Sequence, residues 1–227
     1  MRITTVLLIF LIFICLSCEK DKFELGDCRG DDCIGASGYV YDRLTNEPLN
    51  SATILISYKE NCGWCGTGCL FRDFEIGTVI TDITGNFHTD FSSKEFEGIT
   101  GSYVFEVAYD DFMEEKVWIA NDNQKDLFIE SSLNPPAYLN LSISLMETEN
   151  IEYFGLDISP DSLSARSIGG YNSNRLGLFI DTTLIFKVPA ERKVYFGYLI
   201  KTDIDKKYSN DSVIINRFET LGYEINE

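Results

Sequence analysis

Apolar and polar residues alternate along many short segments of this chain, a pattern that is typical of β-strands with one buried face. The clearest case is residues 137–145, in which every second residue is apolar. Residues 52–58 and 103–109 alternate in the same way, and no segment of the first half keeps the 3.6-residue period of an amphipathic helix. The pattern therefore predicts an all-β fold.

Turn-forming residues separate the expected strands and place a boundary near the middle of the chain. Asp42–Leu49 and Asp82–Asn86 are rich in Asp, Asn, Gly and Pro, which favour bends for separate steric and hydrogen-bonding reasons. The two prolines of Asn134–Pro136 cannot donate hydrogen bonds to a sheet, so they mark a linker. We expect one β-sandwich over residues 34–133 and a second small β-sandwich over residues 134–227. A single sheet packed on the first domain is the alternative for the second half.

A set of residues in the first half has a distinctive spacing across strands and turns. The set comprises Gly38, Val40, Asp42, Thr45, Pro48, Leu49, Ala52, Ile54, Thr81, Asp82, Gly85 and Phe87. It resembles the carboxypeptidase regulatory-like domain, which occurs on metallocarboxypeptidases, on TonB-dependent receptors and in many Gram-negative lipoproteins. The resemblance covers less than half of the chain. It implies a transthyretin-like or Ig-like β-sandwich that serves as a scaffold or recognition module, since catalysis on carboxypeptidases belongs to a separate domain. Unlike in the family, the loop between Tyr58 and Gly77 is long and contains three cysteines.

The N-terminal residues resemble the signal peptide of a bacterial lipoprotein. A short positive start is followed by the apolar run Val6–Leu16, which is too short to span a bilayer core of about 30 Å. The run ends at Ser17-Cys18, which resembles a lipobox, although Cys15 stands where that motif usually has Leu. The resemblance implies cleavage after Ser17, acylation of Cys18 and attachment to a membrane through the lipid. An ordinary secretory signal that is cut nearby is the alternative.

Residues 1–17 are accordingly predicted to be the signal peptide, and residues 18–33 a flexible polar tether. The acidic residues and lysines directly after Cys18 are similar to signals that send some Gram-negative lipoproteins to the outer face. We therefore expect an outer-membrane lipoprotein, at the periplasmic or the cell-surface face.

Five cysteines follow the predicted lipidation site, namely Cys28, Cys33, Cys62, Cys65 and Cys69. Beyond the inner membrane their expected fate is disulfide formation, and because five is odd at least one thiol has no partner within the mature chain. We expect the insert that holds Cys62, Cys65 and Cys69 to be bridged within itself or to the segment of Cys28 and Cys33. Two alternatives stay open, a zinc site completed by Cys33 or His88 and a redox-active Cys62-x-x-Cys65 pair. The leading interpretation includes no metal and no cofactor.

The charge and the composition argue against several classes of function. The formal net charge of −17 at pH 7 repels phosphate backbones, and since no basic cluster offsets it we expect no nucleic-acid binding. His88 is the only histidine, which excludes a multi-histidine metal centre, and neither a G-x-S-x-G motif nor a Gly-rich phosphate loop is present. Asp42, Asp82 and Gly85 fit turns better than a ligand site. We predict that the protein is not an enzyme.

The leading hypothesis is a lipid-anchored protein that acts as a non-catalytic binding or assembly accessory. Its partner would be an envelope protein or an extracellular polymer such as a glycan. Trp64 and Trp118 are the candidate contact aromatics, because exposed Trp side chains supply large amphipathic contact surfaces. A passive structural spacer is the alternative, and a carbohydrate-active or proteolytic enzyme comes third.

Overall fold

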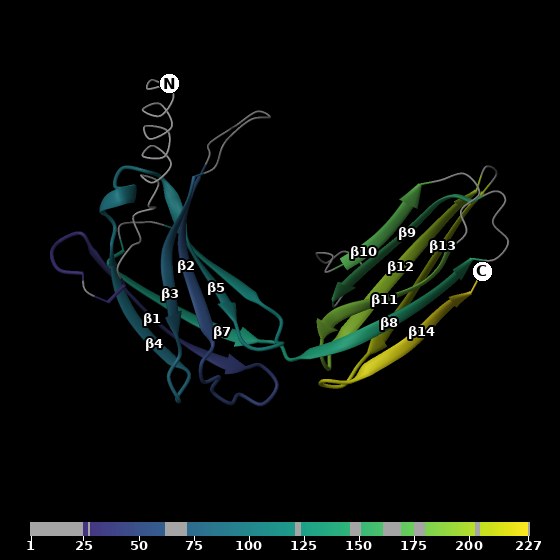
Figure 1. Cartoon of the computed structure of the whole chain (residues 1–227), viewed down its shortest axis with the longest axis horizontal. Coiled ribbons are helices and arrows are strands. Elements are labelled where there is room, and N and C mark those ends of the chain that lie inside the picture. The colour runs from purple at the N-terminus through teal and green to yellow at the C-terminus, as the bar shows by residue number, and fades with distance from the viewer. Residues whose placement is uncertain are drawn as a thin grey trace, which may run out of the picture. The chain divides into compact units, whose positions relative to one another are not determined.

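The structure is a computed structural model, and it is almost entirely β (Figure 1). It describes residues 25–26, 28–61, 72–120, 124–145, 151–160, 169–174, 180–202 and 205–226. The chain divides into two compact units, with the main boundary between Ser131 and Ser132. The second unit also includes two short segments from the first half, Tyr41–Leu49 and Ala108–Glu115. The predicted all-β fold is confirmed.

The first seven strands form a three-stranded sheet, in the order β4-β1-β7, and a four-stranded sheet, in the order β3-β2-β5-β6. The strands are β1 (Cys33–Asp42), β2 (Thr53–Glu60), β3 (Asp73–Ile80), β4 (Asn86–Ser92), β5 (Gly101–Ala108), β6 (Glu115–Ala120) and β7 (Asp126–Leu133). Every second residue of β1 is buried, as the alternating sequence requires of a strand with one face on a core. The result is a β-sandwich, as predicted.

Aromatic side chains fill one end of the first core. The ring of Tyr58 stacks on that of Phe96 with 4.4 Å between centroids, and Tyr103 packs edge-on against both rings. All three side chains are almost fully buried. Phe96 belongs to a short 3-10 helix, η1 (Lys94–Phe96), and the Tyr58 hydroxyl donates to the carbonyl oxygen of Ile99 at 2.5 Å. These contacts hold the segment between β4 and β5 against the four-stranded sheet.

Several residues of the set that resembles the carboxypeptidase regulatory-like domain form turns or allow close backbone contacts in the first sandwich. The Asp82 carboxylate accepts hydrogen bonds from the backbone amides of Thr84 and Asn86, at 2.8 and 3.1 Å. Gly85 follows with a φ of 75°, which a glycine adopts without strain. Gly38 has a different role, because a Cβ there would lie 2.2 Å from the carbonyl oxygen of Ile129 on β7. The prediction that Asp82 and Gly85 are turn residues is confirmed.

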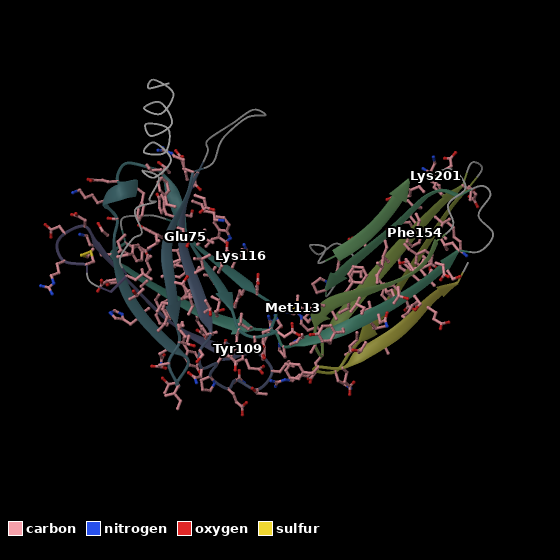
Figure 2. The ribbon with its side chains drawn as sticks, in the orientation of Figure 1. Glu75, Tyr109, Met113, Lys116, Phe154 and Lys201 are labelled. Carbon is pink, nitrogen blue, oxygen red and sulfur yellow. A yellow bond between two sulfur atoms is a disulfide. The ribbon has the colours of Figure 1, made fainter. Side chains whose placement is uncertain are left out.

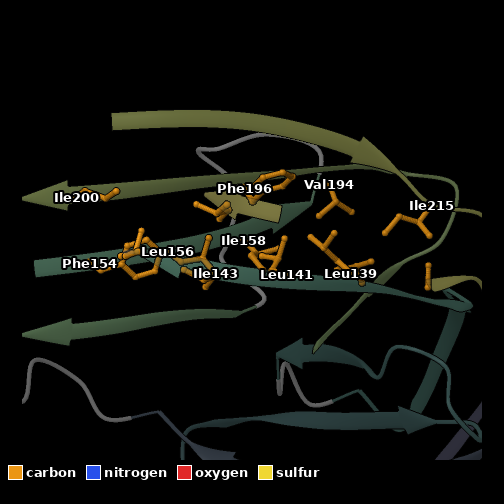
Figure 3. Close-up of a cluster of buried hydrophobic side chains, with 14 of the residues drawn as sticks. Leu139, Leu141, Ile143, Phe154, Leu156, Ile158, Val194, Phe196, Ile200 and Ile215 are labelled. Atoms are coloured by element: carbon orange, nitrogen blue, oxygen red, sulfur yellow. The ribbon is translucent and has the colours of Figure 1, made fainter. Parts of the chain in front are cut away.

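The second unit is itself a two-sheet sandwich rather than a single sheet. Its strands are β8 (Pro136–Leu145), β9 (Ile151–Pro160), β10 (Gly169–Asn174), β11 (Ile180–Pro189), β12 (Lys193–Thr202), β13 (Lys206–Ile214) and β14 (Thr220–Asn226). The sheet orders are β10-β9-β12-β13 and β11-β8-β14, and β14 runs parallel to β8. The alternate apolar residues of β8 enter a core shared with β9 and β12, which includes Leu141, Phe154 and Phe196 (Figure 3). Full burial of each such side chain contributes about 1.5–3 kcal/mol.

Asp42, at the end of β1, combines a turn with a buried ion pair inside the second unit. Its Oδ1 accepts the backbone amide of Leu44 at 2.8 Å, so its predicted role in a turn is confirmed. Its Oδ2 lies 2.8 Å from Nη2 of Arg217, and the Asp42 side chain is only 2% exposed. The Arg217 guanidinium in turn lies over the rings of Phe218 and Phe112, at 4.8 and 5.8 Å from their centroids. One carboxylate therefore stabilises both a turn and an arginine held between aromatic rings.

Two substitutions separate these roles of Asp42. Asp42→Asn keeps an acceptor for the Leu44 amide but removes the charge that faces Arg217, and we expect a loss of about 2 kcal/mol in the free energy of unfolding. Asp42→Ala removes both interactions and should cost about 1 kcal/mol more. Urea unfolding curves of the two variants measure the difference. Asp157→Asn, an exposed change on β9, is the matched control. An Asp42→Asn protein as stable as the wild type would show that the ion pair contributes nothing.

Candidate binding site at the disulfide end of the first sandwich

A cavity of about 170 Å³ lies at one end of the first sandwich. Its lining comes from four places in the chain: the start of β1 and the residues just before it, the segment between β4 and β5, β5 itself, and the residues just before β7. Residues far apart in the sequence meet here because β1 pairs with both β4 and β7. The ends of these strands therefore converge, and the connections that follow them enclose the space.

The floor of this cavity is apolar and aromatic. Ile34, Phe96 and Tyr103 line it, and each is at most 5% exposed. The Tyr103 hydroxyl is buried and has no hydrogen-bond partner among the residues that the structure describes. Burial, and secondarily the neighbouring Tyr58, raises the pKa of Tyr103, so the phenol keeps its proton at physiological pH. An unpaired buried hydroxyl is unfavourable, which makes this group a donor in need of an acceptor.

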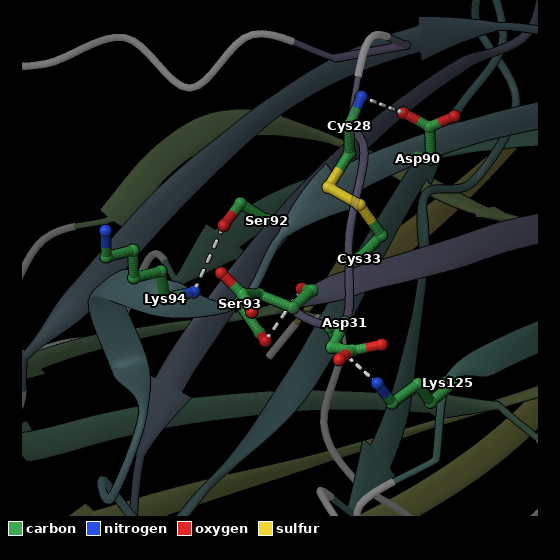
Figure 4. The surroundings of a disulfide bond; sticks show 9 residues. Cys28, Asp31, Cys33, Asp90, Ser92, Ser93, Lys94 and Lys125 are labelled. Carbon is green, nitrogen blue, oxygen red and sulfur yellow. Dashed lines mark hydrogen bonds between the residues drawn. A yellow bond between two sulfur atoms is a disulfide. The ribbon is translucent and has the colours of Figure 1, made fainter.

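The rim of the cavity is polar and is held by backbone contacts. It includes Asp31, Ser93, Glu97, Gln124 and Lys125. The Lys125 ammonium donates to the carbonyl oxygen of Asp31, and the Ser93 hydroxyl donates to the carbonyl oxygen of Asp32 at 2.9 Å (Figure 4). The segment before β1 is thus attached both to the start of η1 and to the start of β7. The rim is built before any ligand arrives.

A disulfide between Cys28 and Cys33 closes the same segment (Figure 4). The Cys28 amide donates to the Asp90 carboxylate at 2.8 Å, and the Gly26 amide donates to the Asp90 carbonyl at 2.9 Å. Within the predicted tether of residues 18–33, these residues are therefore fixed to β4. The local pairing also corrects one expectation, since neither Cys28 nor Cys33 is free to bridge to the cysteine insert.

The pairing limits what the remaining cysteines can do. Cys33 carries no free thiolate in the disulfide, so it is not the fourth ligand of a zinc site. The side chain of His88, the other proposed fourth ligand, is exposed on β4. Of the two arrangements predicted for the cysteine insert, only a disulfide within the insert itself stays open. Cys18, Cys62, Trp64, Cys65 and Cys69 lie outside the described residues.

Trp118 does not line the cavity; it lies on the outer face of the four-stranded sheet. It is 57% exposed, and the Lys59 ammonium sits 5.8 Å from its ring centroid. Lys59 and Lys116 flank Glu106, with ammonium-to-carboxylate distances of 3.7 and 2.7 Å (Lys116 is labelled in Figure 2). The hydrogen bond from Lys116, followed by the charges of Lys116 and Lys59, holds the pKa of Glu106 below its usual range. Trp118 therefore belongs to a charged sheet face and is not gathered with other aromatics at the cavity.

The described residues contain no group of three or more His, Cys, Asp or Glu side chains placed to hold a metal ion. His88, the one candidate base, stands opposite Ser37 in the β1–β4 pairing and is exposed. In the same part of the chain, no helix has the length and apolar character needed to span a membrane. What the described residues bring together is a cavity with an apolar floor and a polar rim.

No family model matches the chain, and no curated protein matches it. Among solved structures, the TIE protein of Bacillus anthracis is 11% identical over 86% of this chain, with a TM-score of 0.32. This chain spans only 34% of that protein's length. A putative carbohydrate-binding protein from Bacteroides uniformis is 10% identical over 82% of this chain and all of its own, with a TM-score of 0.29. The shaft pilin SpaA of Lactobacillus rhamnosus GG is 11% identical over 86% of this chain and 96% of its own, with a TM-score of 0.31.

Three further similar structures are pilins, and another is a lipoxygenase, matched over 54% of this chain and 20% of its own. At such low identities and TM-scores, these likenesses carry no argument about the role of this protein.

Sequence reasoning did not find the cavity. Its floor residues Phe96 and Tyr103 appear in the sequence as ordinary apolar positions, and Gln124 and Lys125 as ordinary loop residues. The one available signal was the pair Cys28 and Cys33, whose short spacing favours a local bridge beside the first strand. Nothing in the sequence indicates that the segment after β4 closes over the same place.

Removing the disulfide should weaken the first sandwich measurably. The bridge closes a loop with a sequence separation of 5, and the loop-entropy relation gives about 2 kcal/mol for so short a loop. We expect the double variant Cys28→Ser with Cys33→Ser to lose about that much, measured by urea unfolding. Peptide mapping of the unreduced wild type provides the check on connectivity. A peptide that links Cys28 or Cys33 to the insert would contradict the structure.

The charged face around Trp118 gives a pH prediction. The pKa of Glu106 should lie below the ordinary value of 4.5 in the folded protein, and Lys116→Met should raise it towards that value. Because the folded pKa is the lower one, the ion pair stabilises the fold above about pH 4.5 and this contribution is lost as the pH falls through the folded pKa. Carboxyl-carbon NMR titration measures the pKa. Lys94→Met is the control, and an unchanged Glu106 titration in Lys116→Met would refute the assignment.

Proposed function

We propose that this protein is a lipid-anchored, non-catalytic binding accessory of the bacterial outer membrane. The observation that carries the proposal is the preformed cavity at the end of the first sandwich. Its floor is buried and aromatic, its rim is polar, and a disulfide and several backbone hydrogen bonds hold it. Concave sites that combine apolar walls with a few fixed polar groups are the usual places where proteins bind small ligands.

The anchor rests on the sequence around Ser17-Cys18, which resembles a lipobox. Acylation of Cys18 would attach the mature chain to the membrane, at the periplasmic or the cell-surface face. The resemblance to carboxypeptidase regulatory-like domains supports a scaffold or recognition role for the first sandwich. Its partner would be an envelope protein or a glycan of the cell surface.

Crosslinking on intact cells tests the proposal. We expect the wild-type protein to capture one dominant envelope component, identified by mass spectrometry of peptides and by glycan staining. Cys18→Ala cannot be acylated at this position, so it should leave the membrane fraction and lose the captured component at least tenfold. The mass of the mature wild-type protein reports the acylation directly.

Two outcomes would count against the proposal. Wild-type protein that captures nothing above the uncrosslinked background would favour a passive spacer. Cys18→Ala protein that stays in the membrane fraction, with a mass that differs from the wild-type mass only by the substitution itself, would refute the lipid anchor while leaving the binding role open to the same capture assay.

A further inference from the structure

We infer that the cavity between β1, η1 and the start of β7 binds one neutral sugar ring, such as an exposed monosaccharide unit of a surface glycan. The inference rests on the proposed binding function and names the ligand class of the same site.

Size limits the ligand to a single ring. The cavity volume is about 170 Å³, and a protein cavity of about 150 Å³ is known to hold one benzene molecule. One six-membered ring therefore fits, whereas two linked rings do not fit entirely inside. A larger glycan would place one unit in the cavity and leave the rest in solvent beyond the rim.

The floor distinguishes a sugar from a purely apolar ring. Phe96 and Ile34 offer carbon surface to the C–H face of a ring, but the hydroxyl of Tyr103, which also lines the cavity, has no acceptor among the described residues. Benzene or an aliphatic ligand would leave that donor unpaired, which is unfavourable by about 1–3 kcal/mol. A sugar ring can place its C–H groups against the apolar side chains and offer an oxygen atom as acceptor to the hydroxyl.

The rim supplies the hydrogen-bonding groups that a polyol needs. The carboxylates of Asp31 and Glu97 accept hydrogen bonds from hydroxyl groups, and the Gln124 amide can both donate and accept. These three side chains are exposed, so they can turn towards a ligand without first breaking a core contact.

Charge disfavours an acidic ligand. Two carboxylates stand on the rim, and the one lysine there, Lys125, already donates to the carbonyl oxygen of Asp31. The chain as a whole has a formal net charge of −17. A uronic acid or a phosphate would therefore meet repulsion, and a neutral ring avoids that repulsion.

The decisive variant is Tyr103→Phe, because it separates binding from folding. In the ligand-free protein the hydroxyl has no partner within the described residues, so its removal should leave the free energy of unfolding unchanged or slightly higher. If a ligand oxygen accepts from this hydroxyl, the same change should weaken sugar binding by about threefold to tenfold.

The experiment titrates the full-length lipoprotein in detergent with glucose, galactose, mannose and N-acetylglucosamine, followed by isothermal calorimetry and by saturation-transfer NMR. We expect at least one of them to bind with a Kd of about 1 mM, the range suited to a ligand of this size. Trp118→Ala, outside the cavity, should match the wild type.

Several results would overturn the inference. If glucosamine, titrated alongside as an amine-bearing sugar, is the only one that binds, and Glu97→Gln abolishes that binding, the site is a cation site. If Tyr103→Phe binds the sugars as the wild type does, the sugars are not held in this cavity. If no sugar binds while crosslinking still captures an envelope protein, the sugar assignment fails and the proposed function stands; if both assays are negative, the proposed function fails as well.

Discussion

The stacking of Phe96 on Tyr58 is the contact on which the described end of the first sandwich depends. This contact packs η1 against the sheet. It thereby positions Ser93 and Glu97, which flank η1 and form part of the cavity rim. Tyr103 completes the cluster, and its position edge-on to both rings places its hydroxyl among apolar neighbours. Without the stack, the connection between β4 and β5 would be an ordinary surface loop, and the space beneath it would be open to solvent.

The elements that the sequence predicts well are those set by local pattern. β8 alternates strictly, and it is a strand over the expected residues. Asp82 and Gly85 form a turn because their own side chain and backbone preferences suffice to form it. The main boundary between the two compact units, at Ser131 and Ser132, lies close to the prolines after Asn134, but the second unit also includes Tyr41–Leu49 and Ala108–Glu115.

The candidate site could not be predicted in this way, because it depends on which distant strand ends converge. Gln124, Ser93 and Asp31 become neighbours only through the pairing of β1 with β4 and β7, and no local preference encodes that pairing. For the same reason, the candidate contact aromatics did not indicate where the cavity lies. Trp118 is exposed, as expected of a contact residue, yet it lies among the ion pairs of a sheet face, while buried Tyr103 reaches the cavity.

The parallel pairing of β14 with β8 has a consequence for how the second sandwich folds. β8 is the first strand of the second sandwich and the central strand of its three-stranded sheet. One of its two neighbours, β14, follows in the chain only after five intervening strands. Closing so long a connection carries a large entropic penalty before any contact compensates for it, which makes such pairings slow. During synthesis, one edge of β8 therefore stays unpaired until Thr220–Asn226 has emerged. In that interval the edge is open to pairing with other chains, which makes the unfinished second sandwich prone to aggregation.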